Sequence, residues 1–449
     1  MPDQFIVGVD VGSSKLCSAV AVRERSGAVR YVGHGSAPSG GLRGGEVIDP
    51  EALSAAFRRA VEEARYLIGT PVEDIVVSIS GAHIEPIDRM GGLDLTTDRP
   101  VSVEDIVQAI SQSRGTDPAG LHTVHRVVRG MALDSEPVSD PTGRYGRRLD
   151  VWTRDYAVPS QLIDRLRQSA EAAGVRIHTL IPEGVAAASS ALSPTERDAG
   201  VALIDIGSAT TDIAVYAGGD LQHIAGFALG GHHVTADIAA MLEIPLDEAE
   251  DLKRAHGAIG EDNREELYEW TPRAIAQLQR LASFGEVPPA AVRTIAAARA
   301  VQIIDRAREA LVASDTLQLL QSGAVLTGGG SMLTGIGDIA SAILGVPVRC
   351  GGVLAGDGFP GIADPTVSAS VGLTRYCATR AAMPPPTRRE TRSYSMGAGA
   401  SAFVHPLVMQ TAFGFGGSER DTTTRRDRGA ARRAFTSWLR EFVPARMEE

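Results

Sequence analysis

Two stretches of the chain place an aspartate, a glycine and a serine in the same order at the end of an apolar run. They are FIVGVDVGSSKLCSAVAV, residues 5–22, and GVALIDIGSATTDIAVYA, residues 200–217. A second alternating apolar run follows each serine, and this period of two predicts a β-hairpin whose turn carries Asp-x-Gly-Ser. The chain therefore repeats one hairpin, around Asp10 and around Asp205.

A turn of this kind suits a polyphosphate bound with magnesium. Glycine lets a phosphate approach the backbone N–H groups, and serine adds a hydroxyl donor. The aspartate repels phosphate, but it can hold Mg²⁺ through water, and the ion neutralises the phosphate charge. One copy alone is better explained as an ordinary hairpin, because such turns are common. Two copies in matching apolar surroundings indicate a pair of turns that close on one ligand from both sides.

A glycine-rich stretch is the third candidate element. AVLTGGGSMLTGI, residues 324–336, predicts a strand that runs into three glycines before a helix. Backbone without side chains can lie flat against a base or a sugar, and a helix N-terminus favours negative charge. The stretch therefore suits the nucleoside part of a nucleotide.

The elements that must position these residues alternate between helix and strand. We expect strands near 74–80, 123–133, 148–158 and 176–181, and helices near 50–67, 102–113, 160–173, 182–192, 234–318 (most of that region) and 365–379. This mixed order of strands and helices occurs in both halves of the chain, which favours two related α/β lobes with insertions.

Composition restricts the class of protein. A chain of 449 residues is too long for one ordinary core, and its net charge of -11 argues against nucleic-acid binding. The cysteines show no CxxC spacing, so we expect free thiols in a reducing cytoplasm. We find no signal peptide and no apolar run of the ~18 residues needed to span a bilayer, so we expect a soluble body.

The composition changes after three prolines at 384–386. Residues 387–429 are rich in Gly, Ser, Thr and Arg, which is typical of a flexible tether. Within it, 403–415 is apolar, and the sequence leaves open whether this segment docks on the body or on a partner.

The last segment, AARRAFTSWLREFV at 430–443, predicts an amphipathic helix. At ~21 Å it is too short to span a membrane and suits the interface of an anionic membrane surface. Residues 386–447 hold eleven Arg against five acidic residues, which favours such a surface. Packing on the body or on a partner helix is the alternative. The candidate membrane residues are Arg433, Phe435, Trp438, Leu439, Arg440 and Phe442.

Three motifs in this order resemble those of the actin, Hsp70 and sugar-kinase superfamily. They are Asp10 to Lys15 (phosphate 1), Asp205 to Asp212 (phosphate 2) and Leu326 to Gly330 (adenosine). Further stretches narrow the resemblance to the FtsA family of bacterial cell division proteins: GGLRGGEVID (40–49), VVSISGAHI (76–84), HRVVRGMALD (125–134), GGHHVTADIA (230–239) and DEAEDLKRAHG (247–257). The resemblance covers residues 4–380 and the last helix.

The resemblance implies an actin-like two-lobed α/β fold with duplicated ribonuclease-H-like lobes. It divides the chain into a first lobe (1–82 and 161–197), an inserted FtsA-type α+β subdomain (83–160), a second lobe (198–236 and 305–385) with an outer subdomain (237–304), a flexible linker (386–429) and a terminal amphipathic membrane-targeting helix (430–444).

The resemblance also implies the site. Asp10 and Asp205 would hold Mg²⁺ through water, and phosphate contacts would come from Gly12, Ser13, Ser14, Lys15, Gly207, Ser208 and Thr210. The remaining nucleotide contacts would come from Gly230 and Gly231 beneath the terminal phosphate, Glu250 and Lys253 around the ribose and adenine, and Gly328, Gly329, Gly330 and Met332 on the adenosine face. Water would be oriented by Glu183 and Asp212, which join Asp10 and Asp205 as the candidate catalytic residues.

Structural alternatives stay open for three of these residues. Glu250 is also explained as part of a helix cap with Asp247, an Asp-x-x-Glu arrangement. Lys253 is also explained as a solvated helix face, and Asp212 as a partner of a neighbouring strand.

The implied function is that of a peripheral adaptor at the cytoplasmic face of the inner membrane, at the division site. It would bind ATP or ADP with Mg²⁺, polymerise with copies of itself, tether FtsZ and contact other divisome membrane proteins. Hydrolysis is left open, because relatives are slow hydrolases and no strong base is evident. The alternatives are a pilus-assembly ATP-binding adaptor and a small-molecule kinase; an Hsp70-like chaperone would need a longer C-terminal part.

Overall fold

A computed structural model describes residues 4–259, 272–283 and 286–380, which divide into two compact units. The first holds residues up to 230, then 309–332 and the described chain from 346 onwards, and the second holds 231–308 and 333–345. The expected linker and the terminal helix at 430–444 lie outside the described residues. None of the helices in the described part of the chain is long and apolar enough to cross a bilayer.

The first unit contains two five-stranded sheets with the same strand order. They run β11-β6-β1-β2-β3 and β16-β15-β12-β13-β14. In both, the central strand pairs antiparallel with the strand that follows it and parallel with a later strand. The first sheet comprises β1 (Gln4–Val11), β2 (Lys15–Arg23), β3 (Val29–Pro38), β6 (Asp74–Ile79) and β11 (Arg176–Pro182); the second comprises β12 (Val201–Ile206), β13 (Thr211–Ala217), β14 (Asp220–Phe227), β15 (Ala324–Thr327) and β16 (Val348–Cys350). The expected α/β fold with duplicated lobes is confirmed.

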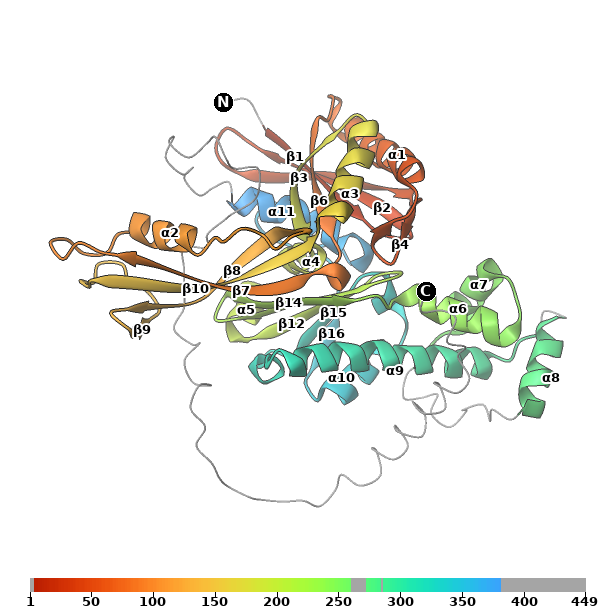
Figure 1. Cartoon of the computed structure of the whole chain (residues 1–449). Coiled ribbons are helices and arrows are strands. Elements are labelled where there is room, and N and C mark those ends of the chain that lie inside the picture. The colour runs from red at the N-terminus through yellow and green to blue at the C-terminus, as the bar shows by residue number, and fades with distance from the viewer. Residues whose placement is uncertain (1–3, 260–271, 284–285, 381–449) are drawn as a thin grey trace, which may run out of the picture. The chain divides into compact units, whose positions relative to one another are not determined.

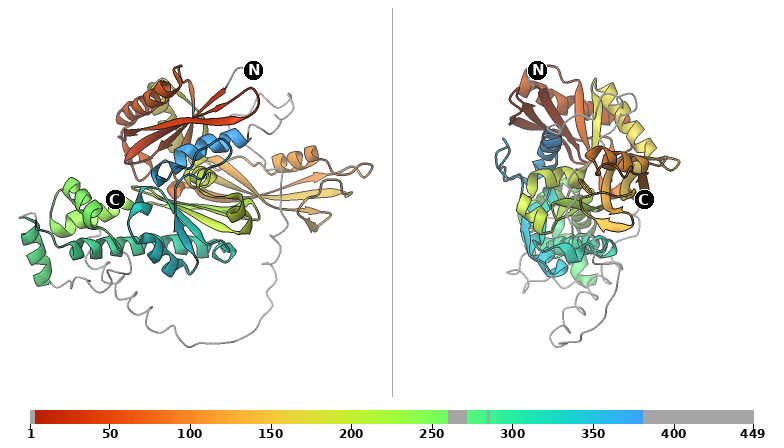
Figure 2. Two further views of the ribbon diagram at one scale, coloured as in Figure 1. Left: turned by 180° about the vertical axis from the view of Figure 1, so that it is seen from behind. Right: turned by 90° about the vertical axis from the view of Figure 1, so that its left-hand side faces the viewer.

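Helices cover both faces of the first sheet. Helices α1 (Pro50–Ile68) and α3 (Ser160–Ala172) lie side by side on one face, as Figures 1 and 2 show. Helix α11 (Ser368–Arg380) packs on β1 and β2, and also on α4 (Glu183–Ala191), which in turn packs on β12 and β13. Helices α4 and α11 therefore connect the two sheets. The short α5 (Pro194–Ala199) follows α4.

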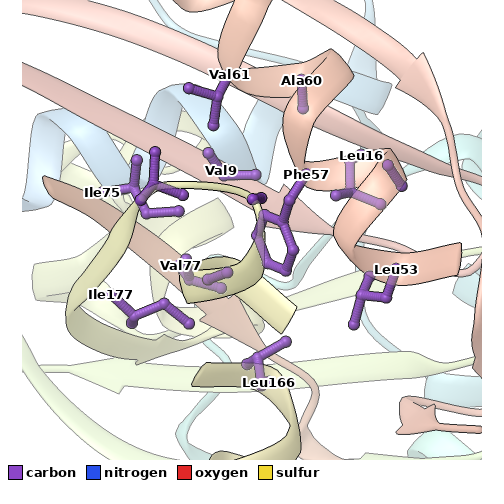
Figure 3. Packing of buried hydrophobic residues seen from close by; sticks show 14 of the residues in the cluster. Val9, Leu16, Leu53, Phe57, Ala60, Val61, Ile75, Val77, Leu166 and Ile177 are labelled. Carbon is purple, nitrogen blue, oxygen red and sulfur yellow. The ribbon is translucent and has the colours of Figure 1, made fainter. Parts of the chain in front are cut away.

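Helix α1 packs on the first sheet through an apolar core that includes β1 and β2. Helix α1 begins at Pro50, where the Asp49 side chain accepts hydrogen bonds from two backbone N–H groups, and it ends at the left-handed Gly69. Figure 3 shows Phe57 and Leu53 of α1 packed among apolar side chains of the sheet. Alternate residues of β2 face opposite sides, so one set packs on α1 and the other on the segment 353–371.

Residues 85–159 contain a separate four-stranded sheet, β7-β10-β8-β9, with α2 (Val103–Gln112) on one face (Figure 1). Its strands are β7 (Glu85–Asp94), β8 (Leu121–Leu133), β9 (Glu136–Val138) and β10 (Arg148–Pro159). Strand β7 was not predicted, because EPIDRMGGLD contains a proline and two glycines, which are poor strand formers. Pairing with β10 along its whole length supplies what local propensity lacks. A two-stranded ribbon, β4 (Leu42–Arg43) with β5 (Glu46–Val47), precedes α1.

The second unit is helical in its described residues, which agrees with the expected helical region. Its helices are α6 (Gly231–Leu242), α7 (Leu246–His256), α8 (Pro272–Ala282), most of α9 (Pro289–Ala313) and α10 (Ile336–Leu344). A buried ion pair joins α6 to α9: Arg299 Nε lies 2.6 Å from Oδ2 of Asp237, and Nη2 lies 2.7 Å from Oδ1.

Candidate functional site

Each hairpin turn is short and depends on its glycine. A Cβ on Gly12 would lie 2.8 Å from the carbonyl oxygen of Lys15, and one on Gly207 would lie 3.1 Å from that of Thr210. The second turn is closed by the N–H of Gly207, which donates to the carbonyl of Thr210 at 2.9 Å. Any larger residue would therefore crowd the turn. Ser13 and Ser208 are half-buried in these turns, and Ser14 is exposed.

Four carboxyl groups influence one another around the two hairpins. Burial raises the pKa of Asp205 well above its ordinary value, and the charges of Asp10 and Asp212 raise it further. Burial also raises the pKa of Glu183 well above its ordinary value, and the same three aspartates add to the effect. The first unit therefore concentrates acidic groups that a bound cation would stabilise in their ionised form.

Asp10 is oriented by a neighbouring strand. The hydroxyl of Ser78 on β6 donates to Oδ1 of Asp10 at 2.7 Å and accepts from the N–H of Val11 at 2.9 Å. Burial raises the pKa of Asp10, while the hydrogen bond from Ser78 and the charge of Lys15 oppose that rise. Lys15 itself donates to the hydroxyl of Thr366 at 2.7 Å.

Asp212 faces Asp205 in the register of β12 and β13, and it is buried. Its carboxylate accepts from the N–H of Gly81 and from the hydroxyl of Ser80, the latter at 3.3 Å. Burial raises the pKa of Asp212 to about 7, although these two hydrogen bonds act in the opposite direction. The structure thus gives Asp212 the neighbouring-segment contact that the sequence left open as an alternative.

The three consecutive glycines are not equivalent. Gly328 has a φ of +79°, and a Cβ there would overlap Oδ1 of Asp205, while a Cβ on Gly330 would overlap the side chain of Ile206. Gly329 is exposed, and the nearest atom to its Cβ position is the Thr366 methyl at 3.8 Å. Packing against β12 therefore explains two of the glycines, and Gly329 alone presents open backbone.

The expected helix does not follow the glycines directly. Residues Gly329–Met332 form a 3-10 turn, and α10 begins only at Ile336. The predicted order of strand, glycine turn and helix is therefore present, with the 3-10 turn at Gly329–Met332 preceding α10. Anion binding at this helix N-terminus stays a prediction. Met332 is 62% exposed.

Gly230 lies against the second turn. A Cβ there would lie 2.5 Å from the carbonyl oxygen of Gly207 and 2.7 Å from that of Ser208. The hydroxyl of Thr211 donates to the carbonyl of Leu229 at 2.7 Å, which fixes the approach of this segment. Of the predicted glycine pair, Gly230 thus belongs with the Asp205 turn, while Gly231 begins α6 in the second unit.

Glu250 and Lys253 form one network within the second unit. Lys253 Nζ donates to Oε2 of Glu250 at 2.6 Å, to the hydroxyl of Thr235 at 2.9 Å and to the carbonyl of Gly231 at 3.2 Å. The hydroxyl of Thr235 donates to Oε2 of Glu250 at 2.5 Å. Burial alone would raise the pKa of Glu250, but the hydrogen bonds and charge of Lys253 and Thr235 bring it to about 2.

The structure excludes the helix-cap explanation of Glu250 and the solvated-face explanation of Lys253. The helix that contains Glu250 is preceded by Pro245 and has no side-chain cap, so Asp247 does not form the Asp-x-x-Glu capping arrangement. The Lys253 side chain is only 16% exposed, so it is not a solvated face. Both residues instead fix α7 against α6.

The donor set fits a magnesium nucleotide held through water. Within the described ranges, no group of three or more His, Cys, Asp and Glu side chains could hold a metal ion directly. The sequence-based expectation was water-mediated, and the paired acidic groups with raised pKa values beside two glycine turns match it in chemistry. The hydroxyls and backbone N–H groups of the turns match phosphate.

Four contributing residues were missed by sequence reasoning. These are Ser78, Ser80, Gly81 and Thr366, which touch the predicted acids or Lys15. The first three lie in the stretch VVSISGAHI, which the sequence marks only as a family resemblance. The usable signal was two serines in an otherwise apolar strand. A cavity of about 540 Å³ also lies in the first unit, between α2, β8, α5 and α11, but none of the predicted site residues lines it.

Comparison with known proteins gives consistent results. A family model described as "Cell division protein FtsA" matches residues 202–372. The FtsA protein of Pseudomonas aeruginosa is 29% identical over 387 residues, which cover 83% of this chain and 89% of the relative. That of Escherichia coli K12 is 28% identical over 383 residues, which cover 83% of this chain and 90% of the relative.

A solved structure shares the fold. The PilM-PilN type IV pilus biogenesis complex matches with a TM-score of 0.53 and 18% identity, covering 84% of this chain and 99% of that chain. At this level of identity the likeness concerns the fold alone, so it does not favour the pilus-assembly alternative.

Proposed function

Because this chain belongs to the FtsA family of actin-like cell division proteins, we propose that it binds ATP or ADP with Mg²⁺ and assembles with copies of itself at the cytoplasmic face of the membrane. At the division site it would tether FtsZ to that surface and contact other division membrane proteins. The observation that carries the proposal is the pair of glycine turns, each preceded by an acidic residue of raised pKa.

Each part of the nucleotide has candidate residues. Asp10 and Asp205 would hold the magnesium ion through water, and the two turns would donate hydrogen bonds to the phosphates. Gly230 would leave room beneath the terminal phosphate, since a side chain there would collide with the second turn. Gly329 would offer open backbone to the adenosine, as its position is exposed. Bound magnesium supplies positive charge that offsets the phosphates.

Hydrolysis requires an oriented water, and the first unit offers two buried groups for it. Glu183 lies at the start of α4, where burial and the charges of Asp212, Asp10 and Asp205 raise its pKa well above the ordinary value. Asp212 already accepts two hydrogen bonds, from Gly81 and Ser80. Because the FtsA relatives that this chain resembles are slow hydrolases, we propose that turnover is slow and that nucleotide occupancy mainly controls assembly.

Membrane attachment is assigned to the C-terminal amphipathic helix by its sequence. One short helix binds a lipid surface weakly, but a polymer presents many copies at once, so assembly converts weak attachment into firm attachment. The body would remain outside the bilayer. The far end of the second lobe, about 240–300, is proposed as the FtsZ contact by family resemblance.

Liposome flotation with and without ATP and FtsZ tests the proposal. We expect the protein to float with anionic liposomes, more strongly with ATP, and to carry FtsZ with it. Failure to recruit FtsZ in the presence of ATP would contradict the tethering role. Transfer of phosphate from ATP to a sugar would instead favour the kinase alternative.

A further inference from the structure

One four-residue segment contacts acidic side chains from both hairpins. Ser78 to Gly81 spans the end of β6 and the start of the 3-10 turn Gly81–His83. Strand β6 belongs to the first sheet, yet the segment reaches Asp10 of the first hairpin and Asp212 of the second. All of these residues lie in the first unit.

The contact with Asp10 orients its carboxylate. Ser78 is buried, and its hydroxyl donates to Oδ1 of Asp10 at 2.7 Å while accepting from the N–H of Val11. A hydroxyl that accepts on one side and donates on the other has a fixed direction. The carboxylate is therefore held in one orientation through Oδ1.

The contact with Asp212 comes from the other end of the segment. The N–H of Gly81 and the hydroxyl of Ser80 both donate to this carboxylate. Asp212 stands directly opposite Asp205, the next-to-last residue of β12 before the second turn. The segment thus contacts Asp212, and Asp212 pairs with Asp205 beside the second turn.

Backbone packing fixes this arrangement. A Cβ on Gly81 would lie 2.7 Å from the carbonyl oxygen of Ala225, and one on Gly226 would lie 2.5 Å from the carbonyl carbon of Gly81. Gly226 pairs with Asp212 in the register of β13 and β14. The segment therefore touches the second sheet backbone to backbone, at the point where it also binds Asp212.

We propose that the Ser78–Gly81 segment is a positioning element that sets the relation of the two turns, so that the acids of both hairpins act on one magnesium nucleotide. The inference rests on the proposed nucleotide binding. No residue of the segment needs to touch the nucleotide. Its serines act through Asp10 and Asp212. They therefore affect only the part of the ATP affinity that depends on magnesium.

The test measures ATP affinity twice for each variant, with Mg²⁺ and with EDTA. We expect Ser78→Ala and Ser80→Ala each to reduce the magnesium-dependent gain in affinity by about tenfold, while the metal-free affinity is unchanged. Ser80→Thr retains the hydroxyl and should restore the gain. Ser54→Ala is the matched control, because Ser54 is a buried serine on α1 whose hydroxyl has no hydrogen-bond partner among the residues that the structure describes.

Two results would overturn the inference. One is an unchanged magnesium-dependent gain in both alanine variants; the other is an equal loss with and without magnesium, which indicates a merely structural role. If the wild-type protein binds no magnesium nucleotide, the proposed function fails as well, and this outcome is distinct from the first two. Should an alanine variant not fold, Ser78→Cys and Ser78→Thr replace it, since threonine keeps the hydroxyl and cysteine is a weaker donor of similar size.

Discussion

Cys17 and Asp212 occupy equivalent positions in the two sheets. Cys17 lies opposite Asp10 in the β1–β2 pair, and Asp212 lies opposite Asp205 in the β12–β13 pair. The thiol of Cys17 accepts from the hydroxyl of Ser370 at 3.4 Å, whereas Asp212 accepts from the N–H of Gly81, in the turn after β6. The duplicated hairpins are therefore similar in backbone and different in charge, because the second contributes two acids and the first only one.

Substitution of Asp205 should change the stability of the ligand-free protein and its nucleotide affinity in opposite directions. Asp205→Asn removes a buried acid whose pKa is raised well above its ordinary value, so the protein without ligand should become more stable. The same change should weaken magnesium-ATP binding by about tenfold or more. Thermal unfolding and calorimetric titration measure the two effects. Asp247→Asn, an exposed residue of α7, is the control for the charge change and should alter neither.

Stability without ligand should depend on pH through Asp212. Its pKa rises from 3.8 to about 7 on folding, so its contribution to stability is full below about 3.8 and is lost as the pH rises through about 7. Denaturant unfolding at pH 5, 6, 7 and 8 should show this decline. Asp212→Asn should make the decline shallower. Equal pH dependence in the variant and the wild-type protein would refute the assignment.

The glycine triplet offers a matched pair of substitutions. Gly328→Ala places a Cβ onto Asp205 at a φ of +79°, and we expect a loss of about 2 kcal/mol or more in the free energy of unfolding. Gly329→Ala meets nothing nearer than 3.8 Å, so the fold should tolerate it. If Gly329 contacts adenosine, its alanine variant should still weaken ATP binding. Similar free energies of unfolding for both variants would contradict the packing of Gly328 against Asp205.

The Glu250 network should support the second unit against acid. Its pKa of about 2, below the ordinary 4.5, means that its contribution to stability is present above about 4.5 and is lost as the pH falls toward 2. Glu250→Gln should remove that dependence in acid unfolding followed by circular dichroism. Glu248→Gln, an exposed neighbour on the same helix, should leave it in place.

Membrane attachment is tested by Trp438→Glu. Placing a charge in the apolar stripe should release the protein from anionic liposomes in a sedimentation assay, because that face would no longer enter the interface. Tyr66→Glu is the control, since Tyr66 is 88% exposed on α1. Unchanged sedimentation of the Trp438 variant would remove the basis for the helix as membrane anchor.

Much of the fold was predictable because its signals are local. The strands of the hairpins around Asp10 and Asp205 alternate between apolar and other residues. Helix α1 lies between residue types common at helix ends, Asp49 at its N-cap and Gly69 at its C-cap. Strand β3 was missed because VRYVGHGSAP is interrupted by Gly33 and Gly35. Those glycines are explained only by tertiary packing, since Cβ atoms there would lie 2.9 Å from Leu67 and 2.7 Å from Glu63 of α1.

The two hairpin turns of the site were predictable from the sequence. The residues that orient their acidic side chains, Ser78 and Ser80, were not. Asp10, Gly12 and Gly207 follow from the repeat, because hairpin residues are close in sequence. The link from Ser78 to Asp10 joins residues 68 positions apart, and that from Ser80 to Asp212 joins residues 132 positions apart. Hydrophobic periodicity is a local signal and does not indicate contacts between residues so far apart in sequence. The role proposed for the Ser78–Gly81 segment could therefore be inferred only from the structure.

The most direct test of the central claim is a crystal structure of the protein grown with ATP and Mg²⁺. We predict one nucleotide per chain, with its phosphates in contact with both the turn after Asp10 and the turn after Asp205. A nucleotide bound elsewhere, or touching only one of these turns, would contradict the account.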